Sequence, residues 1–216
     1  MRVLIVDHGC CDHPHTRAHR VAEDLRQLGI RAAVCGPSSA PSLESGPTDM
    51  YGIHLHDVAA ASRVLLAAVR GGDPDAFLAA SATVPARLLG LVRETARQSL
   101  AEAVDIVYPD VIFVMHAGIL TDLAVETGAP VVVHVSPGDL AAASGRTSLR
   151  NLVAAAIGSC DGIVAADADT AAAIRESWLD GDSSGLERCA AWPLDGDCAA
   201  HIDRACRQAI RGRRGG

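Results

Sequence analysis

Side chains that could catalyse proton transfer follow two apolar runs of this sequence, at the point where each run ends. His116 follows the first run, and Ser136 and Asp139 follow the second. A histidine at such a position can orient a substrate hydroxyl or act as an acid or base near neutral pH. Capping the following helix, or bonding to a nearby loop, is an equally good interpretation. Pro137 and Gly138 predict a turn that leaves the Asp139 carboxylate available to substrate hydroxyls.

A second group of polar side chains lies in the loop that follows the first apolar run of the chain. The loop contains His8, Gly9, His13 and His15, together with the adjacent Cys10 and Cys11. Imidazole and thiolate are typical zinc ligands, but this spacing matches no standard zinc pattern, and two adjacent cysteines do not easily share one tetrahedral site. The favoured interpretation is a polar loop whose histidines and glycine bind substrate in a cleft. Metal binding by the loop is the alternative.

Several motifs for cofactors and nucleophiles are incomplete in this sequence. The chain has no lysine, which excludes a Walker A loop and Schiff-base or pyridoxal chemistry. Gly9 alone does not make the three-glycine fingerprint of dinucleotide-binding loops, so NAD or FAD binding is not expected and no cofactor is predicted. The letters of G-x-S-x-G occur at residues 181–185. Because a nucleophile elbow needs a strand before it, and a predicted helix precedes this segment, we interpret the match as a coincidence.

The hydrophobic pattern predicts the elements that would position these residues. Short apolar runs without polar alternation are typical of strands buried on both faces, as in parallel sheets. The predicted strands are Arg2–Val6, Arg31–Cys35, Gly52–Leu55, Val111–Met115, Val131–Val135, Gly162–Ala165 and Cys189–Trp192. Helices are predicted between them, most clearly His15–Leu28. The alternation indicates an α/β fold with one doubly wound, mostly parallel sheet and helices on both of its faces. Within it, His134 is expected to be a hydrogen-bonded core histidine.

Two further helical regions complete the predicted organisation. Residues 57–104 form a helical stretch that is broken at 71–75 and at Pro85. The final helix, Cys198–Ile210, has an apolar face that predicts docking on the rest of the chain. We therefore expect one domain over residues 1–195, and a C-terminal helix with an arginine-rich tail over 196–216. The tail is interpreted as a solvated helix end, with a partner or an anionic surface as the alternative.

Composition limits the classes of function. The 49% hydrophobic and 21% charged content is ordinary for a globular protein, and the net charge of −7 argues against a nucleic-acid partner. No apolar run approaches the roughly 18 residues of a membrane span, so no transmembrane segment is expected. Seven scattered cysteines, an odd number, do not indicate a secreted disulfide framework and favour a cytoplasmic protein.

The order of these patterns resembles the N-terminal domain of a family 4 glycosyltransferase of the GT-B fold. The family's "pDvihvH" strand is matched by Pro109–His116, its "G.PvVvt.HG.D" segment by Gly128–Asp139, and its "aD.via.S" strand by Cys160–Asp167. The resemblance covers about residues 1 to 195. It implies a Rossmann-like domain that contacts the acceptor, with His116 and Asp139 as catalytic candidates. It also implies that Ser136, Gly138 and the first loop line the cleft.

The sequence departs from the family at important positions. The Gly-Gly pair of the family's first loop falls near Asp12 and His13, and the histidine of its "HG" motif falls on Ser136, with Pro137 in place of the glycine. The family's C-terminal domain grips the diphosphate of the nucleotide sugar and carries a glutamate motif. The inter-domain position is expected at Trp192–Asp195, and the residues that follow predict one helix in place of that domain.

The resemblance therefore implies the acceptor-side half of a split or truncated, sugar-nucleotide-dependent glycosyltransferase. The other half would be a protein partner carrying a nucleotide-sugar-binding domain, or a second copy of this chain. The nucleotide sugar would be a substrate held mainly by that partner, and the acceptor would be a small molecule or a glycan. Two alternatives stay open. The lost motif residues favour a non-catalytic accessory or regulatory subunit of a glycosyltransferase, and the histidine-rich first loop favours a stand-alone hydrolase or isomerase of a sugar-like metabolite.

Overall fold

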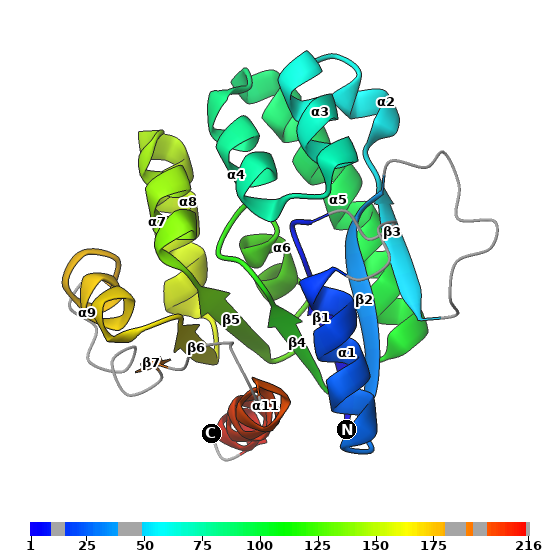
Figure 1. Cartoon of the computed structure of the whole chain (residues 1–216), viewed down its shortest axis with the longest axis vertical. Coiled ribbons are helices and arrows are strands. Elements are labelled where there is room, and N and C mark those ends of the chain that lie inside the picture. The colour runs from blue at the N-terminus through cyan, green and yellow to red at the C-terminus, as the bar shows by residue number, and fades with distance from the viewer. Residues whose placement is uncertain (10–15, 39–48, 180–188, 192–197, 215–216) are drawn as a thin grey trace.

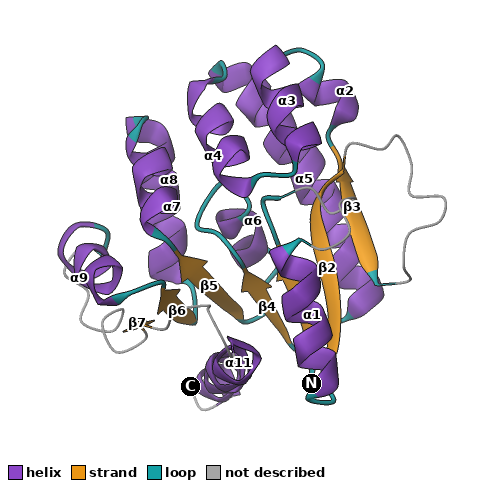
Figure 2. Ribbon diagram, viewed as in Figure 1, coloured by secondary structure: helices purple, strands orange, loops and turns teal. Residues whose placement is uncertain are grey.

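The computed structural model describes residues 1–9, 16–38, 49–179, 189–191 and 198–214, and its centre is a seven-stranded sheet (Figures 1 and 2). The strand order is β3-β2-β1-β4-β5-β6-β7, and every neighbouring pair is parallel. The strands are β1 (Arg2–Val6), β2 (Arg31–Ser38), β3 (Met50–His54), β4 (Val111–Val114), β5 (Val131–Val135), β6 (Gly162–Ala165) and β7 (Cys189–Ala191). The expected α/β class and doubly wound parallel sheet are confirmed, and β1, β5 and β6 have the predicted bounds.

Helices cover both faces of the sheet. On one face, α1 and α11 pack against the strands, and the other helices pack on the opposite face or against one another. The helices are α1 (Arg17–Gln27), α2 (His56–Ala59), α3 (Arg63–Gly71), α4 (Pro74–Thr83), α5 (Ala86–Val107), α6 (Thr121–Glu126), α7 (Pro137–Ser144), α8 (Thr147–Ser159), α9 (Ala168–Ser177) and α11 (Cys198–Arg214). In the described part of the chain, no helix is both long enough and apolar enough to cross a membrane.

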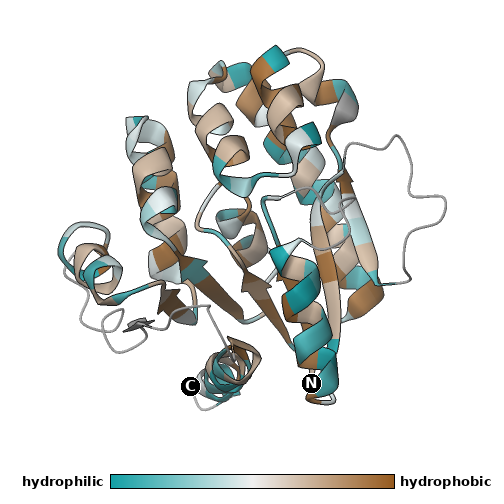
Figure 3. Ribbon diagram, in the orientation of Figure 1, coloured by the Kyte–Doolittle hydropathy of each residue, from teal (hydrophilic) through white to brown (hydrophobic). Residues whose placement is uncertain are grey.

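The uniform apolar character of the strands follows from this two-sided cover. Val3 and Ile5 of β1 belong to the core beneath α1 and α11, whereas Leu4 and Val6 belong to the core on the opposite face. All four side chains are fully buried. Because successive side chains of a strand point to opposite faces, a strand covered on both sides is apolar at nearly every position. Figure 3 shows this as mainly hydrophobic colour along β4, β5 and β6.

The predicted helical stretch 57–104 is divided at three places: two contain glycine or proline, as predicted, and the third, at residues 60–62 between α2 and α3, was not predicted. Gly72 ends α3 in the left-handed region at φ 69°, and the Asp73 side chain caps α4, in which Pro74 is the first residue. A second break falls at Pro85, directly before α5. Glycine adopts positive φ without a Cβ penalty, and proline lacks the N–H that a helix interior needs. The predicted breaks at 71–75 and Pro85 are confirmed.

The C-terminal helix packs on the sheet, and it extends to Arg214 rather than ending at Ile210. Its buried face includes Ile202 and Cys206, which join the core formed with α1. Near its end, Arg213 Nε lies 2.7 Å from Asp161 Oδ1, and Arg213 also donates to the carbonyl of Gly128 at 2.6 Å. All five tail arginines are exposed, as the predicted solvated helix end requires, and Arg213 is in addition tied to residues that precede β5 and β6.

The strand order also brings three strand ends together. The chain moves in one direction from β1 to β2 and in the other from β4 to β5, so the order reverses between β1 and β4. Val6 of β1 is paired with Val114 of β4, and Val114 is paired with Val133 of β5. The residues that follow these strands therefore emerge at one edge. In open α/β sheets, ligands bind at such a reversal, outside the carboxyl ends of the strands.

Candidate functional site

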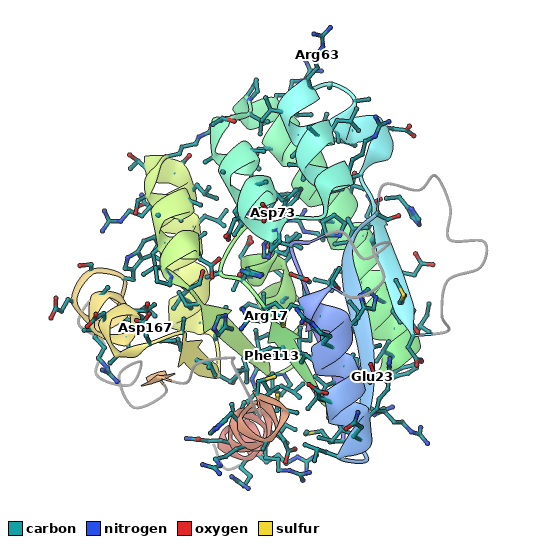
Figure 4. The ribbon with its side chains drawn as sticks, in the orientation of Figure 1. Arg17, Glu23, Arg63, Asp73, Phe113 and Asp167 are labelled. Carbon is teal, nitrogen blue, oxygen red and sulfur yellow. The ribbon has the colours of Figure 1, made fainter. Side chains whose placement is uncertain are left out.

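The candidate site lies at this edge of the sheet, where residues after β1, β4 and β5 meet the starts of α4 and α7. Figure 4 places Asp73, at the start of α4, and Arg17, at the start of α1, at the same edge. The structure brings together six of the predicted site residues, namely His8, Gly9, His116, Ser136, Gly138 and Asp139. The other two, His13 and His15, lie outside the described residues, as do Cys10 and Cys11.

A buried hydrogen bond between His116 and Asp139 is the centre of the site. His116 Nδ1 lies 3.1 Å from Asp139 Oδ1, and only 7% of His116 is exposed, while Asp139 is fully buried. The second carboxylate oxygen of Asp139 accepts from the backbone N–H of Ser136 at 2.8 Å and of Ala117 at 3.2 Å. Both oxygens of Asp139 are therefore occupied within the protein. The carboxylate fixes the orientation of His116 and is itself buried.

The predicted turn at Pro137 and Gly138 is wrong, because these residues begin helix α7. Ser136 is the N-cap, and its hydroxyl accepts from the backbone N–H of Asp139 at 3.2 Å. In return, the Asp139 side chain accepts from the N–H of Ser136, which completes a capping box, and Pro137 takes the first helical position. The Ser-x-x-Asp spacing was the signal for a helix start. Its consequence is that the Ser136 hydroxyl stabilises α7 as an acceptor.

Two further carboxylates face His116, and the sequence interpretation did not single them out. Asp7, directly after β1, places Oδ1 3.7 Å from His116 Nε2, which is beyond ordinary hydrogen-bond distance. Asp75, in the first turn of α4, is exposed and lies beside Gly138, where an added Cβ would be 3.3 Å from its Oδ1. The position of Asp7 after a buried strand was a usable signal. Asp75 reaches the site only through the packing of α4 on α7, for which the sequence has no local sign.

These surroundings raise the pKa of His116 above its ordinary value. Burial is the largest single influence and acts to lower the pKa. It is outweighed by the hydrogen bond to Asp139 together with the negative charges of Asp139, Asp7 and Asp75. The imidazolium form is therefore stabilised at this position, which suits a group that must hold a proton during a reaction.

His8 is also buried at this edge, but its environment favours the neutral ring. Its Nε2 accepts from the backbone N–H of Leu120 at 3.2 Å, and its ring meets that of His116 edge-on with centroids 6.3 Å apart. Burial, and then the charge of His116, lower the pKa of His8 to about 3. His8 Nδ1 has no hydrogen-bond partner among the described residues. His8 therefore supports the loop after β4 as a neutral acceptor.

His134 is buried in β5 as expected, but only one of its two ring nitrogens is hydrogen-bonded among the described residues. Its Nδ1 donates to the carbonyl of Met115 at 3.1 Å, whereas its Nε2 has no partner within the described parts of the chain. Burial is the main cause that lowers the pKa of His134 to about 4. The expectation of a core histidine is confirmed, and its hydrogen bonding is less complete than expected.

Gly118, in the loop after β4, lies so close to neighbouring side chains that no larger residue fits there. A Cβ at this position would overlap the side chain of Leu78 and would lie 2.6 Å from His8 Nε2.

We expect Gly118→Ala to lower the free energy of unfolding by about 2 kcal/mol, because the packed neighbours must move. The matched control is Gly90→Ala in helix α5, where an added Cβ meets nothing within 4 Å. The control should raise stability by roughly 0.5–1 kcal/mol. Urea unfolding of the two variants measures both effects, and equal stabilities would contradict the packing argument.

Asp75, His116 and Asp139 form a group that could be considered for a metal ion, since one ligand atom from each lies within 4.8 Å of the others. The contacts already described argue against this use. His116 Nδ1 and both Asp139 oxygens bond to one another or to the backbone. Among the residues that the structure describes, the exposed Asp75 carboxylate and His116 Nε2 are the ligand atoms of this group without a hydrogen bond. The donor set is better explained as a hydrogen-bonded histidine–carboxylate pair in an acidic surrounding.

Comparison with known proteins identifies similar structures, although no protein-family model and no curated protein sequence matches the chain. A sucrose-phosphate synthase structure from Thermosynechococcus elongatus superimposes with a TM-score of 0.56 over 96% of this chain and 98% of that one, at 11% identity. The chain shares its fold with a sucrose-phosphate synthase. At this identity the similarity concerns the fold alone. A glycosyltransferase from Streptomyces sp. SF2575, SsfS6, aligns over 71% of this chain and 46% of the SsfS6 chain at 15% identity. Its TM-score of 0.42 is too low to support a conclusion about this protein.

Proposed function

We propose that this chain is the acceptor-side half of a sugar-nucleotide-dependent glycosyltransferase, and that it acts with a partner which binds the nucleotide sugar. The observation that carries the proposal is the His116–Asp139 pair at the reversal of strand order between β1 and β4. The fold shared with a sucrose-phosphate synthase and the sequence resemblance to the acceptor-side domain of family 4 enzymes support it.

The geometry of the pair suits a general base for an acceptor hydroxyl. With Nδ1–H donating to Asp139, the lone pair of His116 lies on Nε2, which has no partner within hydrogen-bond distance among the described residues. An acceptor hydroxyl bound there would lose its proton to Nε2 as its oxygen bonds to the anomeric carbon of the donor sugar. The bond from that carbon to the nucleoside diphosphate breaks in the same step. Asp139, held by two backbone N–H groups, stabilises the imidazolium that forms.

A partner is part of the proposal because small-molecule sites in such folds usually lie between two surfaces. The described chain contributes one sheet and its edge. The second wall, including the groups that hold the diphosphate, would come from a protein carrying a nucleotide-sugar-binding domain or from a second copy of the chain. The nucleotide sugar is then a substrate held mainly by that wall.

A second candidate function is a non-catalytic subunit that stabilises or regulates a complete glycosyltransferase. The observation that favours it is the capping box of α7, in which the Ser136 hydroxyl and the Asp139 carboxylate each accept a backbone N–H. Residues at motif positions of the resembled family thus have a structural use here. In this alternative the His116–Asp139 pair holds the loop after β4 against α7 and takes no part in proton transfer.

Reconstitution with the native partner tests the proposal. The tagged chain is used to capture its partner from its native lysate, and each protein is then purified separately. Transfer from a labelled nucleotide sugar is measured with the chain alone, the partner alone and the two together. We expect transfer only, or very predominantly, with both proteins. Full activity of the partner alone would establish the accessory role instead, and recovery of the chain without a stoichiometric partner, as a monomer, would contradict both functions.

A further inference from the structure

A separate cavity lies at the opposite edge of the sheet from His116, where the strands begin. Its volume is about 600 Å³, which lies in the range of small-molecule sites. Its walls include Arg2, Arg26, Arg31, Asp49, Tyr51 and Tyr108. These residues come from the amino ends of β1, β2 and β3 and from the carboxyl ends of α1 and α5. A ligand here would lie far from the strand ends that carry His116, so the cavity does not belong to the site described above.

The charge of the cavity favours an anion. Among the residues that the structure describes, three guanidinium groups line the cavity against one carboxylate, that of Asp49, although the chain as a whole has a net charge of −7. Arg26 is paired with Asp49 at 3.3 Å, and Arg2 lies 3.6 Å from Asp110. Arg31 is exposed, and its guanidinium forms no ion pair with any residue that the structure describes. Arg31 is therefore the group with unused capacity for an anionic oxygen.

The shape and lining of the cavity favour a flat ring beside that anion. Tyr51 and Tyr108 both line it, and Tyr108 is 66% exposed, which is unusual for a large aromatic side chain. The backbone of Tyr108 has φ 48°, and it is the one residue other than glycine with positive φ in the described part of the chain. This conformation costs on the order of 1 kcal/mol for a bulky residue, and such strain is often kept where a side chain has a function.

We propose that this cavity binds a small anion that carries a planar ring, such as a nucleoside 5′-monophosphate. The phosphate bonds to Arg31, with Arg2 and Arg26 adding positive charge, and the ring packs against Tyr108 and Tyr51. The proposal does not depend on the proposed transferase function, because it concerns a different edge of the sheet and its readout is binding.

Calorimetric titration of the whole chain with four probes tests this inference. The probes are a nucleoside 5′-monophosphate, the same nucleoside without phosphate, inorganic phosphate, and an aromatic carboxylate such as 4-hydroxybenzoate. We expect the nucleotide to bind saturably and at least about tenfold more tightly than the nucleoside or phosphate alone, since each of those lacks one half of the recognition. Tighter binding of the aromatic carboxylate would assign the same site to a carboxylate ligand.

Three variants connect the binding to this cavity. Arg31→Gln is expected to weaken nucleotide binding about tenfold, whereas Arg204→Gln, an exposed arginine on α11 outside the cavity, should leave it unchanged. Tyr108→Asn removes the ring while keeping a residue that tolerates the left-handed conformation, so it should weaken binding without loss of stability. Absence of saturable binding of all four probes, or equal effects of the Arg31 and Arg204 variants, would overturn the proposal.

Discussion

Replacing His116 by glutamine is expected to lower the rate of glycosyl transfer by the reconstituted pair of proteins by about 10²–10³-fold, while assembly of the pair is unchanged. Glutamine can still donate a hydrogen bond to the Asp139 carboxylate, which now holds the ring at 3.1 Å, but it cannot accept the proton of an acceptor hydroxyl. The loss would therefore fall on kcat and kcat/KM together, as for an interaction made only in the transition state.

The control for this substitution is His54→Gln, which changes an exposed histidine at the end of β3. Its transfer rate should equal that of the unsubstituted protein. Assembly is measured by light scattering or by titration of one protein with the other. If the His116 variant loses assembly and transfer in equal proportion, the residue is structural and the catalytic assignment is wrong.

The dependence of transfer on pH separates a base from a structural histidine. Because Asp139, Asp7 and Asp75 raise the pKa of His116 against the effect of burial, kcat/KM should increase with pH through that raised pKa, where the ring becomes neutral. Asp139→Asn removes the hydrogen bond to a carboxylate and one negative charge, so the pKa of His116 should fall and the increase should move to lower pH. The maximum rate should also fall, since the imidazolium loses its partner. A merely structural role would reduce the amount of folded protein without moving the profile.

The second large expected effect is a loss of stability in mild acid. Between pH 7 and pH 5 we expect the free energy of unfolding to fall by roughly 3–4 kcal/mol. Burial lowers the pKa of His8 to about 3 and that of His134 to about 4, from the ordinary value of 6.5. Below pH 6.5 the unfolded chain binds a proton at each histidine, and the folded chain does not until the pH reaches these lowered values. Stability is therefore lost as pH falls through this interval.

His116 does not reverse this trend below pH 6.5. Its pKa is raised in the folded protein, so its contribution is fully present below the unfolded value and is lost only as pH rises through the folded pKa. Urea unfolding at pH 7, 6 and 5 measures the slope. His134→Val, in a strand that is otherwise apolar, removes one of the two titrating groups and should reduce the slope to about half, whatever its effect on absolute stability. A slope unchanged by this substitution, with His54→Gln as the control, would contradict the assignment.

The position of the two central residues of the site was predictable from the sequence, but the contact between them was not. His116 and Asp139 follow buried strands, so their meeting at one edge followed from the expected parallel sheet. Their mutual hydrogen bond did not, because it requires α7 to begin at Pro137 rather than a turn to form there. The Ser-x-x-Asp spacing that signals a capping box was present in the sequence, and it outweighs the turn preference of the Pro-Gly pair because proline is favoured at the first helical position.

The sequence by itself determined the fold class, because the central strands are runs of mainly apolar residues without polar alternation, and a sheet covered on both faces buries such runs. It also determined the breaks at Gly72 and Pro85, which depend on backbone chemistry that each residue carries with it. Only the tertiary structure decided the environment of His116. Asp75 approaches it through the packing of α4 against α7, and the pKa of a buried histidine depends on distances to charges that lie tens of residues away in the chain. Local sequence encodes backbone preference, whereas the electrostatics of a site are set by which strand ends and helix starts come to lie side by side.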